Sequence, residues 1–266
     1  MTDLHASEVV QLARVGQVLQ ICLNRPDRRN ALNLAALRGL AAAYTQLSND
    51  PDLRAGVVWA KGDVFCAGLD LADVMPAAIA DGSSCYLQPG LCDPFRLYAP
   101  GCRKPIVVAV QGPCFTAGLE LTLAADVCIA ATDARFAQQE TTRGIMPMGG
   151  ATFRLPARIG WNRAMRCMLA GETFDAAQAA DCGLASEVCP RDALLTRAMA
   201  LAERIAASAP LAVEATLENA RIGEERGGPA AIAHLEARAR QIAQTGDAQE
   251  GLLSLLQKRA PLYRGA

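Results

Sequence analysis

Three short runs of apolar residues constrain the fold of this chain more than any other feature. They read AGVVWAKG, IVVAVQG and DVCIAA, and stretches with helical spacing separate them. Strands that are apolar on both faces and alternate with helices are typical of a parallel sheet that is covered by helices. The sequence therefore predicts an α/β fold.

The segments around these runs extend the pattern. EVVQLARVGQVLQICLN alternates polar and apolar residues around Val15 and Gly16, which predicts a β-hairpin. NLAALRGLAAAYTQLSND spaces its apolar residues at helical intervals, with Asn33 as the expected N-cap. After about residue 190 the chain contains only amphipathic helical segments with Gly, Pro or Asp at their junctions. We therefore expect an α/β core over residues 1–195 and a helical region over residues 196–266.

One long segment shows neither pattern. Between Val74 and Lys104, turn-forming residues mix with scattered apolar ones. A loop of this length is either a binding loop or lid, or a surface segment without a function.

Charge and composition limit the classes of partner. The 266 residues include 26 Lys and Arg against 27 Asp and Glu, and no basic or acidic block stands out. A nucleic-acid or membrane-surface binder would normally present a basic face, and aromatic residues for base stacking are sparse. The N-terminal stretch has no long apolar segment, and no run of about 18 apolar residues occurs. We expect a soluble, cytoplasmic protein.

Cysteine and histidine usage narrows the chemistry. Ten cysteines occur without a CxxC pair, which favours buried, reduced thiols over disulfides. The only histidines are His5 and His234, which argues against a metal site and a Ser-His-Asp triad. No GxGxxG or GxxxxGK[ST] motif occurs, so we do not expect a nicotinamide or phosphate-loop enzyme.

Two glycine-containing turns are candidates for binding a ligand through the backbone. In KGDVFCAGLDLADV, small residues let a ligand approach and leave the N–H of Leu69 free to donate. The alternative without a ligand is a strand-to-helix turn that is capped near Asp70. In QGPCFTAGLELTLAA, Glu120 lies in the first turn of a helix, where an acid ordinarily stabilises the helix dipole by about 0.3–1 kcal/mol. Its leucine neighbours favour burial instead.

A third candidate acid lies in ARFAQQETTRGIMPMGG. Glu140 follows a strand-like segment and precedes a glycine-rich run. On its own it would be a loop acid that forms a surface pair with Arg143.

Together, the order and spacing of these segments resemble the enoyl-CoA hydratase/isomerase (crotonase) superfamily, nearest to its enoyl-CoA hydratases. The resemblance spans nearly the whole chain and rests on LNRPDRRNALN (23–33), FCAGLDL (65–71), VQGPCFTAGLELTLAADVCIA (110–130), FAQQETTRGIMPMGGATFRLPARIGWNRAMRCMLAG (136–171) and FDAAQAADCGLASEV (174–188). It implies a core formed by a spiral of ββα turns that holds the CoA and active site. It also implies a C-terminal helical region that forms trimers, often paired into hexamers.

The resemblance assigns roles to the two acids. Hydratases of this family use two glutamates to add water to a 2-enoyl-CoA thioester, giving 3-hydroxyacyl-CoA, and their positions are Glu120 and Glu140 here. We expect Glu140 to deliver the proton to C2 and Glu120 to orient and deprotonate the water. The backbone N–H groups of Leu69 and Ala117 correspond to the oxyanion hole. Coenzyme A is part of the substrate, and no separate cofactor or metal is implied.

The resemblance also implies a CoA site. Its phosphates would lie near Arg28 or Arg29, and its adenine and pantetheine along the backbone of Ala31, Ala67, Asp70, Leu71 and Ala72. Lys258 and Arg259 either reach the CoA phosphates, across a subunit boundary, or are solvated charges at a helix end.

The sequence departs from the common hydratase pattern at the expected acyl pocket. Thr116-Ala117-Gly118 replaces three glycines, Gln139 replaces a proline, and Met148 replaces a glycine. The Ala117 methyl group either leaves the pocket unchanged or narrows it beside Gly118, and Met148 would make it tighter and more apolar. Dienoyl-CoA isomerases of the family carry an acid at position 148 and an Asp at position 120, where this chain has Met148 and Glu120, so that reaction is disfavoured. Double-bond isomerisation by Glu140 alone and noncatalytic acyl-CoA binding remain alternatives, and hydrolysis is disfavoured because no GxSxG nucleophile occurs.

Overall fold

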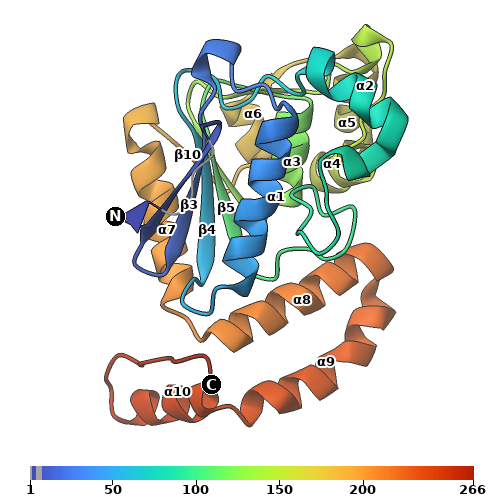
Figure 1. Ribbon diagram of the computed structural model, residues 1–266. Coiled ribbons are helices and arrows are strands. Elements are labelled where there is room, and N and C mark those ends of the chain that lie inside the picture. Colours follow the sequence, from blue (N-terminus) through green and yellow to red (C-terminus); the bar gives the residue numbers. More distant parts are fainter. Residues whose placement is uncertain (1, 4–7) are drawn as a thin grey trace.

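A seven-stranded sheet forms the centre of the computed structural model, which describes residues 2–3 and 8–266 (Figure 1). Its strands, in spatial order, are β1 (Thr2–Asp3), β2 (Val10–Val15), β3 (Val18–Leu23), β4 (Ala55–Ala60), β5 (Ile106–Val110), β7 (Val127–Ala131) and β10 (Glu187–Cys189). The pairs from β3 to β10 are parallel, whereas β1, β2 and β3 are antiparallel. The predicted hairpin and α/β class are confirmed.

Both faces of the sheet are covered by helices, as its apolar strands require. Helix α1 (Leu34–Asn49) packs on one face in the larger apolar cluster, and helix α7 (Leu194–Ala206) packs on the other. The side chain of Asn33 accepts a hydrogen bond from the N–H of Ala36, so the predicted N-cap is confirmed. The alternation of side chains along each strand therefore supplies both halves of the core.

A second, three-stranded sheet gives the core its spiral. It contains β6 (Pro113–Phe115), β8 (Arg135–Ala137) and β9 (Phe174–Asp175). Each of the strands β5 and β7 runs from the large sheet into a short strand of the small one, and helix α3 (Ala117–Ala124) follows β6. The chain after β4 repeats this path, because Cys66 forms a parallel bridge with Cys114. This is the repeat of strand, strand and helix that was expected.

The segment predicted to be irregular begins with a helix. Helix α2 (Leu71–Asp81) and the 3₁₀ helix η2 (Gly82–Cys85) occupy its first part, and residues 86–105 contain no helix or strand. The start of α2 is tied to the start of α1, because the Asp73 carboxylate accepts from the N–H of Leu34 at 2.8 Å. Because the contact joins residues that are far apart in the chain, the local sequence does not predict it.

The remaining helices complete the outer layer. They are η1 (Pro26–Arg28), η3 (Thr141–Arg143), α4 (Ala151–Ile159), α5 (Trp161–Ala170), α6 (Ala176–Asp181) and η4 (Arg191–Ala193).

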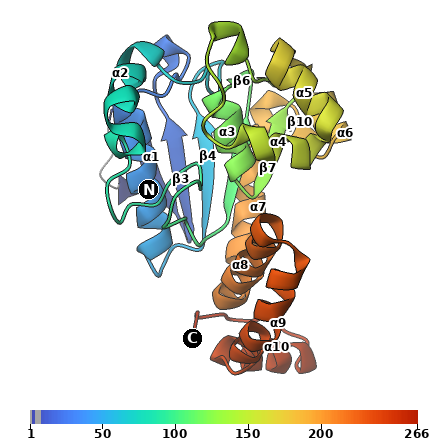
Figure 2. The same ribbon diagram turned by 90° about the vertical axis from the view of Figure 1, so that its right-hand side faces the viewer.

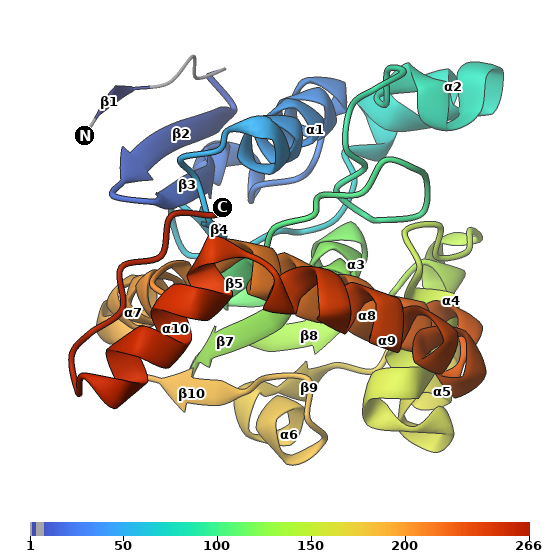
Figure 3. The ribbon, with the colours of Figure 1, turned by 90° about the horizontal axis from the view of Figure 1, so that it is seen from below.

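The C-terminal helices leave the core. Helices α8 (Pro210–Arg226), α9 (Gly228–Ala243) and α10 (Gly246–Leu256) lie beyond the sheet in Figures 1 and 2, and cross in front of it when the molecule is seen from below (Figure 3). Helix α7, which crosses the predicted boundary at residue 195, packs on the sheet. The projecting part therefore starts with α8. Large apolar side chains on α9 and α10 are exposed in the single chain, including Ile232, Leu235, Leu252 and Leu256.

The thiols are reduced, as predicted, and nine of the ten are buried. His234, on α9, lies beside Glu218 and Asn219, and His5 lies outside the described residues. In residues 2–3 and 8–266, no helix is long and apolar enough to cross a membrane. The same residues contain no cluster of three His, Cys, Asp or Glu side chains with the geometry of a metal site.

Candidate active site

A cavity of about 770 Å³ lies where α2, the segment 82–98, the start of α3 and the segment 139–149 meet. Helix α2 is at the end of the core that lies away from α8, α9 and α10 (Figures 1 and 2). Glu120 and Glu140 both line the cavity, as do Leu69 and Ala117. The four residues assigned to the chemistry are therefore brought together from three separate stretches of sequence.

Two turns with unusual backbone conformations form one wall of the cavity. Gly68 has φ +108°, and a Cβ at this position would lie 1.9 Å from the Thr116 hydroxyl oxygen. Thr116 itself has φ +48° and ψ −117°, a conformation that residues with a side chain rarely adopt. The bridge between Cys66 and Cys114 holds these turns side by side. Glycine at 68 is required because the second turn occupies the space that a side chain would need.

These turns leave two N–H groups without acceptors. Asp70 donates its N–H to the Leu32 carbonyl, and Thr116 donates to Ala137, whereas the N–H groups of Leu69 and Ala117 meet no acceptor in the described part of the chain. Ala117 is the first residue of α3, where intrahelical acceptors are lacking and the helix dipole favours negative charge. Two donors at the cavity wall are suited to a carbonyl oxygen that gains negative charge.

Glu120 is held firmly on α3. Its side chain is buried, and Oε1 accepts hydrogen bonds from the N–H of Gly149 at 2.7 Å and the N–H of Ala151 at 3.1 Å. Burial raises the pKa of this carboxyl, and the two N–H donors oppose the effect. Because Oε1 is already bonded, Oε2 is the oxygen that remains for a ligand or water.

Glu140 lies beside η3 and is also buried, with 7% of its surface exposed. Burial, the largest cause, and the nearby negative charge of Glu120 raise its pKa to about 7, against hydrogen bonds from the backbone. The side-chain amide of Gln138 is fully buried beside Glu140, and with its nitrogen turned toward the carboxylate it donates to both oxygens at 2.9 Å. The alternative of a surface pair with Arg143 does not hold, because Arg143 is exposed and forms no ion pair with any described residue.

The two carboxyls are suited to sharing protons. Their environments differ, because Glu120 accepts two strong backbone hydrogen bonds and Glu140 has a pKa near neutrality. Two acids of unequal proton affinity on one cavity can act as a base and an acid toward the same bound molecule.

A family model described as Enoyl-CoA hydratase/isomerase matches residues 14–266. The chain belongs to the enoyl-CoA hydratase/isomerase family. It is 35% identical to the 2,3-dehydroadipyl-CoA hydratase of Escherichia coli (strain K12), over 97% of this chain and 99% of the relative. It is 33% identical to enoyl-CoA hydratase EchA19 of Mycobacterium tuberculosis (strain ATCC 25618 / H37Rv), over 99% of each chain.

Solved structures agree with this assignment. The crystal structure of a probable enoyl-CoA hydratase/isomerase from Mycobacterium abscessus matches with a TM-score of 0.93 and 42% identity, covering 97% of this chain and 99% of that one. An enoyl-CoA hydratase from M. tuberculosis H37Rv matches with a TM-score of 0.88 and 33% identity, covering 98% and 100%. The spiral core is therefore the crotonase fold of this family.

The residues predicted to bind CoA fall into two groups. Ala67 and Leu71 line the cavity, and the N–H of Ala67 donates to the carbonyl of Arg29. Arg28 and Arg29 are exposed on the neighbouring η1 turn and have no ion-pair partner in the described chain. They are thus free to meet an anion, and their role stays a prediction.

The other predicted CoA residues do not line the cavity. Ala31 and Asp70 are tied to Arg25, whose guanidinium donates to the Ala31 carbonyl and to the Asp70 carboxylate at 3.1 Å. Ala72 is exposed on α2. Lys258 follows α10, which lies at the opposite end of the molecule from α2 (Figure 1), and Arg259 beside it is paired with Glu250.

Of the two predicted acyl-pocket residues, only one lines the cavity. Met148 does so, although its side chain is 75% exposed. Gly118 does not, because it packs against Cys66, where a Cβ would lie 2.7 Å from the Cys66 Cβ. Its small size brings α3 close to the neighbouring turn of the spiral. Gly118 therefore does not line the cavity directly, and its role in the acyl pocket stays a prediction.

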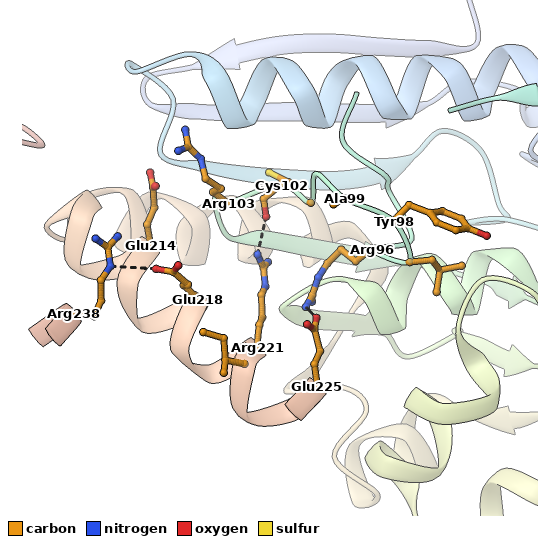
Figure 4. A pocket seen from close by; sticks show the side chains of 13 residues that line it. Arg96, Tyr98, Ala99, Cys102, Arg103, Glu214, Glu218, Arg221, Glu225 and Arg238 are labelled. Atoms are coloured by element: carbon orange, nitrogen blue, oxygen red, sulfur yellow. Dashed lines mark hydrogen bonds and ion pairs between the residues drawn. The ribbon is translucent and has the colours of Figure 1, made fainter. Parts of the chain in front are cut away.

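A second cavity, of about 450 Å³, adjoins the first and is lined by more charged side chains. It lies between the segment 96–103 and α8, with Arg238 contributed by α9 (Figure 4). Leu97 and Tyr98 line both cavities. Its charged side chains are largely paired, as Arg96 with Glu225, Arg221 with Asp126 and Arg238 with Glu218.

Sequence reasoning missed Gln138 and the buried Arg154. Arg154 is 6% exposed and donates to the carbonyl oxygens of Phe95 and Arg96, while the Asp93 carboxylate accepts from the N–H groups of Phe95, Leu97 and Tyr98. These bonds fix the irregular segment that lines the cavity. The only sequence signal was the presence of charged residues in otherwise apolar surroundings.

Proposed function

We propose that this protein is an enoyl-CoA hydratase, which adds water across the 2,3 double bond of a 2-enoyl-CoA thioester to give 3-hydroxyacyl-CoA. The observation that carries the proposal is the arrangement of two buried glutamates and two unbonded backbone N–H groups around one cavity. The relatives named as CoA hydratases, at 33–35% identity over nearly the whole chain, support the same reaction class.

In this proposal, the backbone activates the thioester. The N–H groups of Leu69 and Ala117 donate to the thioester oxygen, and these bonds strengthen as negative charge builds on it. Loss of one such donor in other enzymes costs about 2.7–4 kcal/mol in activation free energy. Because the donors are backbone groups at the ends of fixed turns, they require no rearrangement during the reaction.

The glutamates divide the proton transfers between them. Glu120 accepts a proton through Oε2 from the water that attacks C3, since its Oε1 is engaged by Gly149 and Ala151. Glu140, with a pKa of about 7, is protonated in a large fraction of molecules at neutral pH and delivers its proton to C2. The unequal surroundings of the two acids support this division of roles.

The substrate's CoA moiety binds at the mouth of the cavity in the same proposal. Arg28 and Arg29 are exposed cations close to Ala67, which suits them to the CoA phosphates. The exposed apolar side chains of α9 and α10 support assembly of the chain into a homotrimer or homohexamer. Lys258 would then reach CoA only from a neighbouring subunit.

The test follows the ultraviolet absorbance of 2-enoyl-CoA thioesters, which hydration removes. We expect turnover by the wild type and a loss of at least about 10²-fold in kcat in Glu120→Gln and in Glu140→Gln. Glu203→Gln is the matched control, because Glu203 is an exposed glutamate on α7. Binding of acyl-CoA without hydration of any 2-enoyl thioester would refute the proposal in favour of a binding protein.

Isomerisation is the second candidate, because Glu140 alone has the pKa of a base that can both take and return a proton near neutral pH. It predicts that a 3-enoyl-CoA is converted to the 2-enoyl isomer, and that Glu120→Gln retains this activity. Loss of both activities in Glu120→Gln would exclude this candidate.

A further inference from the structure

The side chain of Thr116 connects the two turns that present the N–H donors of the cavity. Thr116 directly precedes Ala117, and its hydroxyl oxygen lies 1.9 Å from the place that a Cβ of Gly68 would take. Gly68 in turn directly precedes Leu69, the second donor. Thr116 also lines the cavity. Its hydroxyl group therefore belongs to the same part of the cavity wall as both donors.

This hydroxyl group is not used in the way that is usual at the start of a helix. Thr116 is the N-cap residue of α3, and an N-cap threonine ordinarily accepts a hydrogen bond from the first helical turn. Here the side chain forms no such bond, and it has no hydrogen-bond partner elsewhere in the described chain. Its oxygen is not among the fully buried polar atoms that lack a partner in these residues, so it keeps an open surface. Its proton is therefore free for a bound molecule.

The backbone at Thr116 is unfavourable for a threonine. Its φ is +48° and its ψ is −117°, a conformation that glycine adopts readily and a β-branched residue does not. Glycine would remove this strain, but it would also remove the hydroxyl group. Strained residues of this kind are concentrated at functional sites. The strain therefore supports a role for the side chain itself.

The groups at this wall are suited to an oxygen that gains charge. The N–H groups of Leu69 and Ala117 and the hydroxyl of Thr116 are all donors without an acceptor in the described residues. A thioester oxygen has two lone pairs, and the enolate oxygen formed from it has three. The charged oxygen can therefore accept one hydrogen bond more than the thioester in its ground state. A third donor would act mainly on the transition state.

We propose that the hydroxyl group of Thr116 is a third donor of the oxyanion hole, which bonds to the thioester oxygen as negative charge develops on it. This proposal rests on the proposed function and adds one side chain to its catalytic residues. Because the bond forms as the enolate develops, its loss lowers kcat more than it raises KM.

Three substitutions at this position separate the hydroxyl group from the bulk of the side chain. Thr116→Ser keeps the hydroxyl, Thr116→Ala removes it without adding an atom beside Gly68, and Thr116→Val replaces it with a methyl group. We expect kcat for crotonyl-CoA to fall by at least about 10-fold in the Ala and Val variants, with KM changed by less than about threefold. Thr116→Ser should keep kcat within about threefold of the wild type.

Thr216→Val is the matched control. Thr216 is exposed on α8, and its hydroxyl donates to the Ala212 carbonyl. We expect this variant to keep the wild-type kcat. The melting temperature of each variant reports whether it is folded, and the Ala and Ser variants suffice if Thr116→Val does not fold. The proposal is overturned if Thr116→Ala keeps the wild-type kcat, or if Thr116→Ser loses as much as Thr116→Ala.

Hydrogen exchange at C2 of butanoyl-CoA in heavy water distinguishes the two proposals. This saturated thioester cannot be hydrated. Glu140 takes a proton from C2, the enolate forms, and a deuteron returns to C2, so only the C2–H bond is exchanged. If no 2-enoyl-CoA is hydrated but exchange occurs and falls by at least about 10-fold in Thr116→Ala, the hydratase proposal fails and the third donor stands. If the wild type hydrates crotonyl-CoA and Thr116→Ala equals it in both assays, the third donor fails and the hydratase proposal stands.

Discussion

The contact between Gly149 and Glu120 offers a sharp test of the catalytic arrangement. A Cβ at position 149 would lie 2.6 Å from Glu120 Oε2 and 2.8 Å from its Cδ. Both distances are below what real Cβ atoms tolerate, so Gly149→Ala has to displace the carboxylate. Gly149 does not have a positive φ, so alanine is compatible with its backbone.

The expected size of the effect follows from the contacts that move. Displacement weakens the hydrogen bonds that Glu120 Oε1 accepts from Gly149 and Ala151, each of a kind that contributes about 1.5–3 kcal/mol. A misplacement of about 1 Å in an active site can lower the rate by about 10²-fold. We therefore expect kcat of Gly149→Ala to fall by about 10²-fold, with KM changed by less than about threefold.

The assay is hydration of a 2-enoyl-CoA, with Gly223→Ala as the control. Gly223 lies within α8, where a Cβ makes an ordinary 3.5 Å contact with Ala231. We expect this control to keep the wild-type kcat and to unfold at an equal or slightly higher temperature. The reasoning would be refuted if Gly149→Ala kept kcat within threefold of the wild type while retaining its native fold.

Three further predictions concern protonation, packing and the thiols. Because burial raises the pKa of Glu140 to about 7, the native state binds this proton more tightly than the unfolded chain does. The free energy of unfolding should therefore fall by up to about 3 kcal/mol as pH rises from about 4.5 to about 7. Urea unfolding at pH 5 and pH 8 should show this fall to be smaller in Glu140→Gln, and equal falls would contradict it. Gly112→Ala places a Cβ 2.0 Å from the Asp63 carbonyl oxygen and should lower the free energy of unfolding by at least about 3 kcal/mol, whereas Gly16→Ala, with a similar φ and no atom within 4 Å, should cost about 1 kcal/mol. Equal losses would show that the contact is unimportant. A disulfide reagent should modify at most one thiol in the native protein, Cys182, and all ten in urea, and several fast-reacting thiols would contradict the buried assignment.

Much of the fold could be predicted because it depends on local patterns. The strands are apolar on both faces, so their burial between two helical layers follows from the sequence of each strand alone. The burial of Glu120 followed in the same way, since leucines surround it on a short helix.

The parts that escaped prediction depend on contacts between distant segments. Helix α2 contains Pro76 and ends at a glycine, so its sequence resembles a loop, and its start is fixed by the bond from Leu34 to Asp73. Glu140 resembles a surface acid because its burial comes from the elements packed around it. The direction of the Gln138 side chain depends on the turn that follows it, so its bond to Glu140 could not be inferred from their spacing.

The two N–H donors of the cavity have a consequence for how such a protein can change over time. Leu69 and Ala117 present these groups from turns that Gly68 and Thr116 hold together, and almost any side chain except proline keeps an N–H. Substitutions at 69, and small ones at the buried position 117, therefore keep both N–H donors. Substitutions at Glu120 or Glu140 would alter the proposed proton transfers instead. In such a protein the backbone supplies the donors and the side chains determine the reaction. It can therefore acquire a new acyl-CoA reaction while it retains the step that all such reactions share.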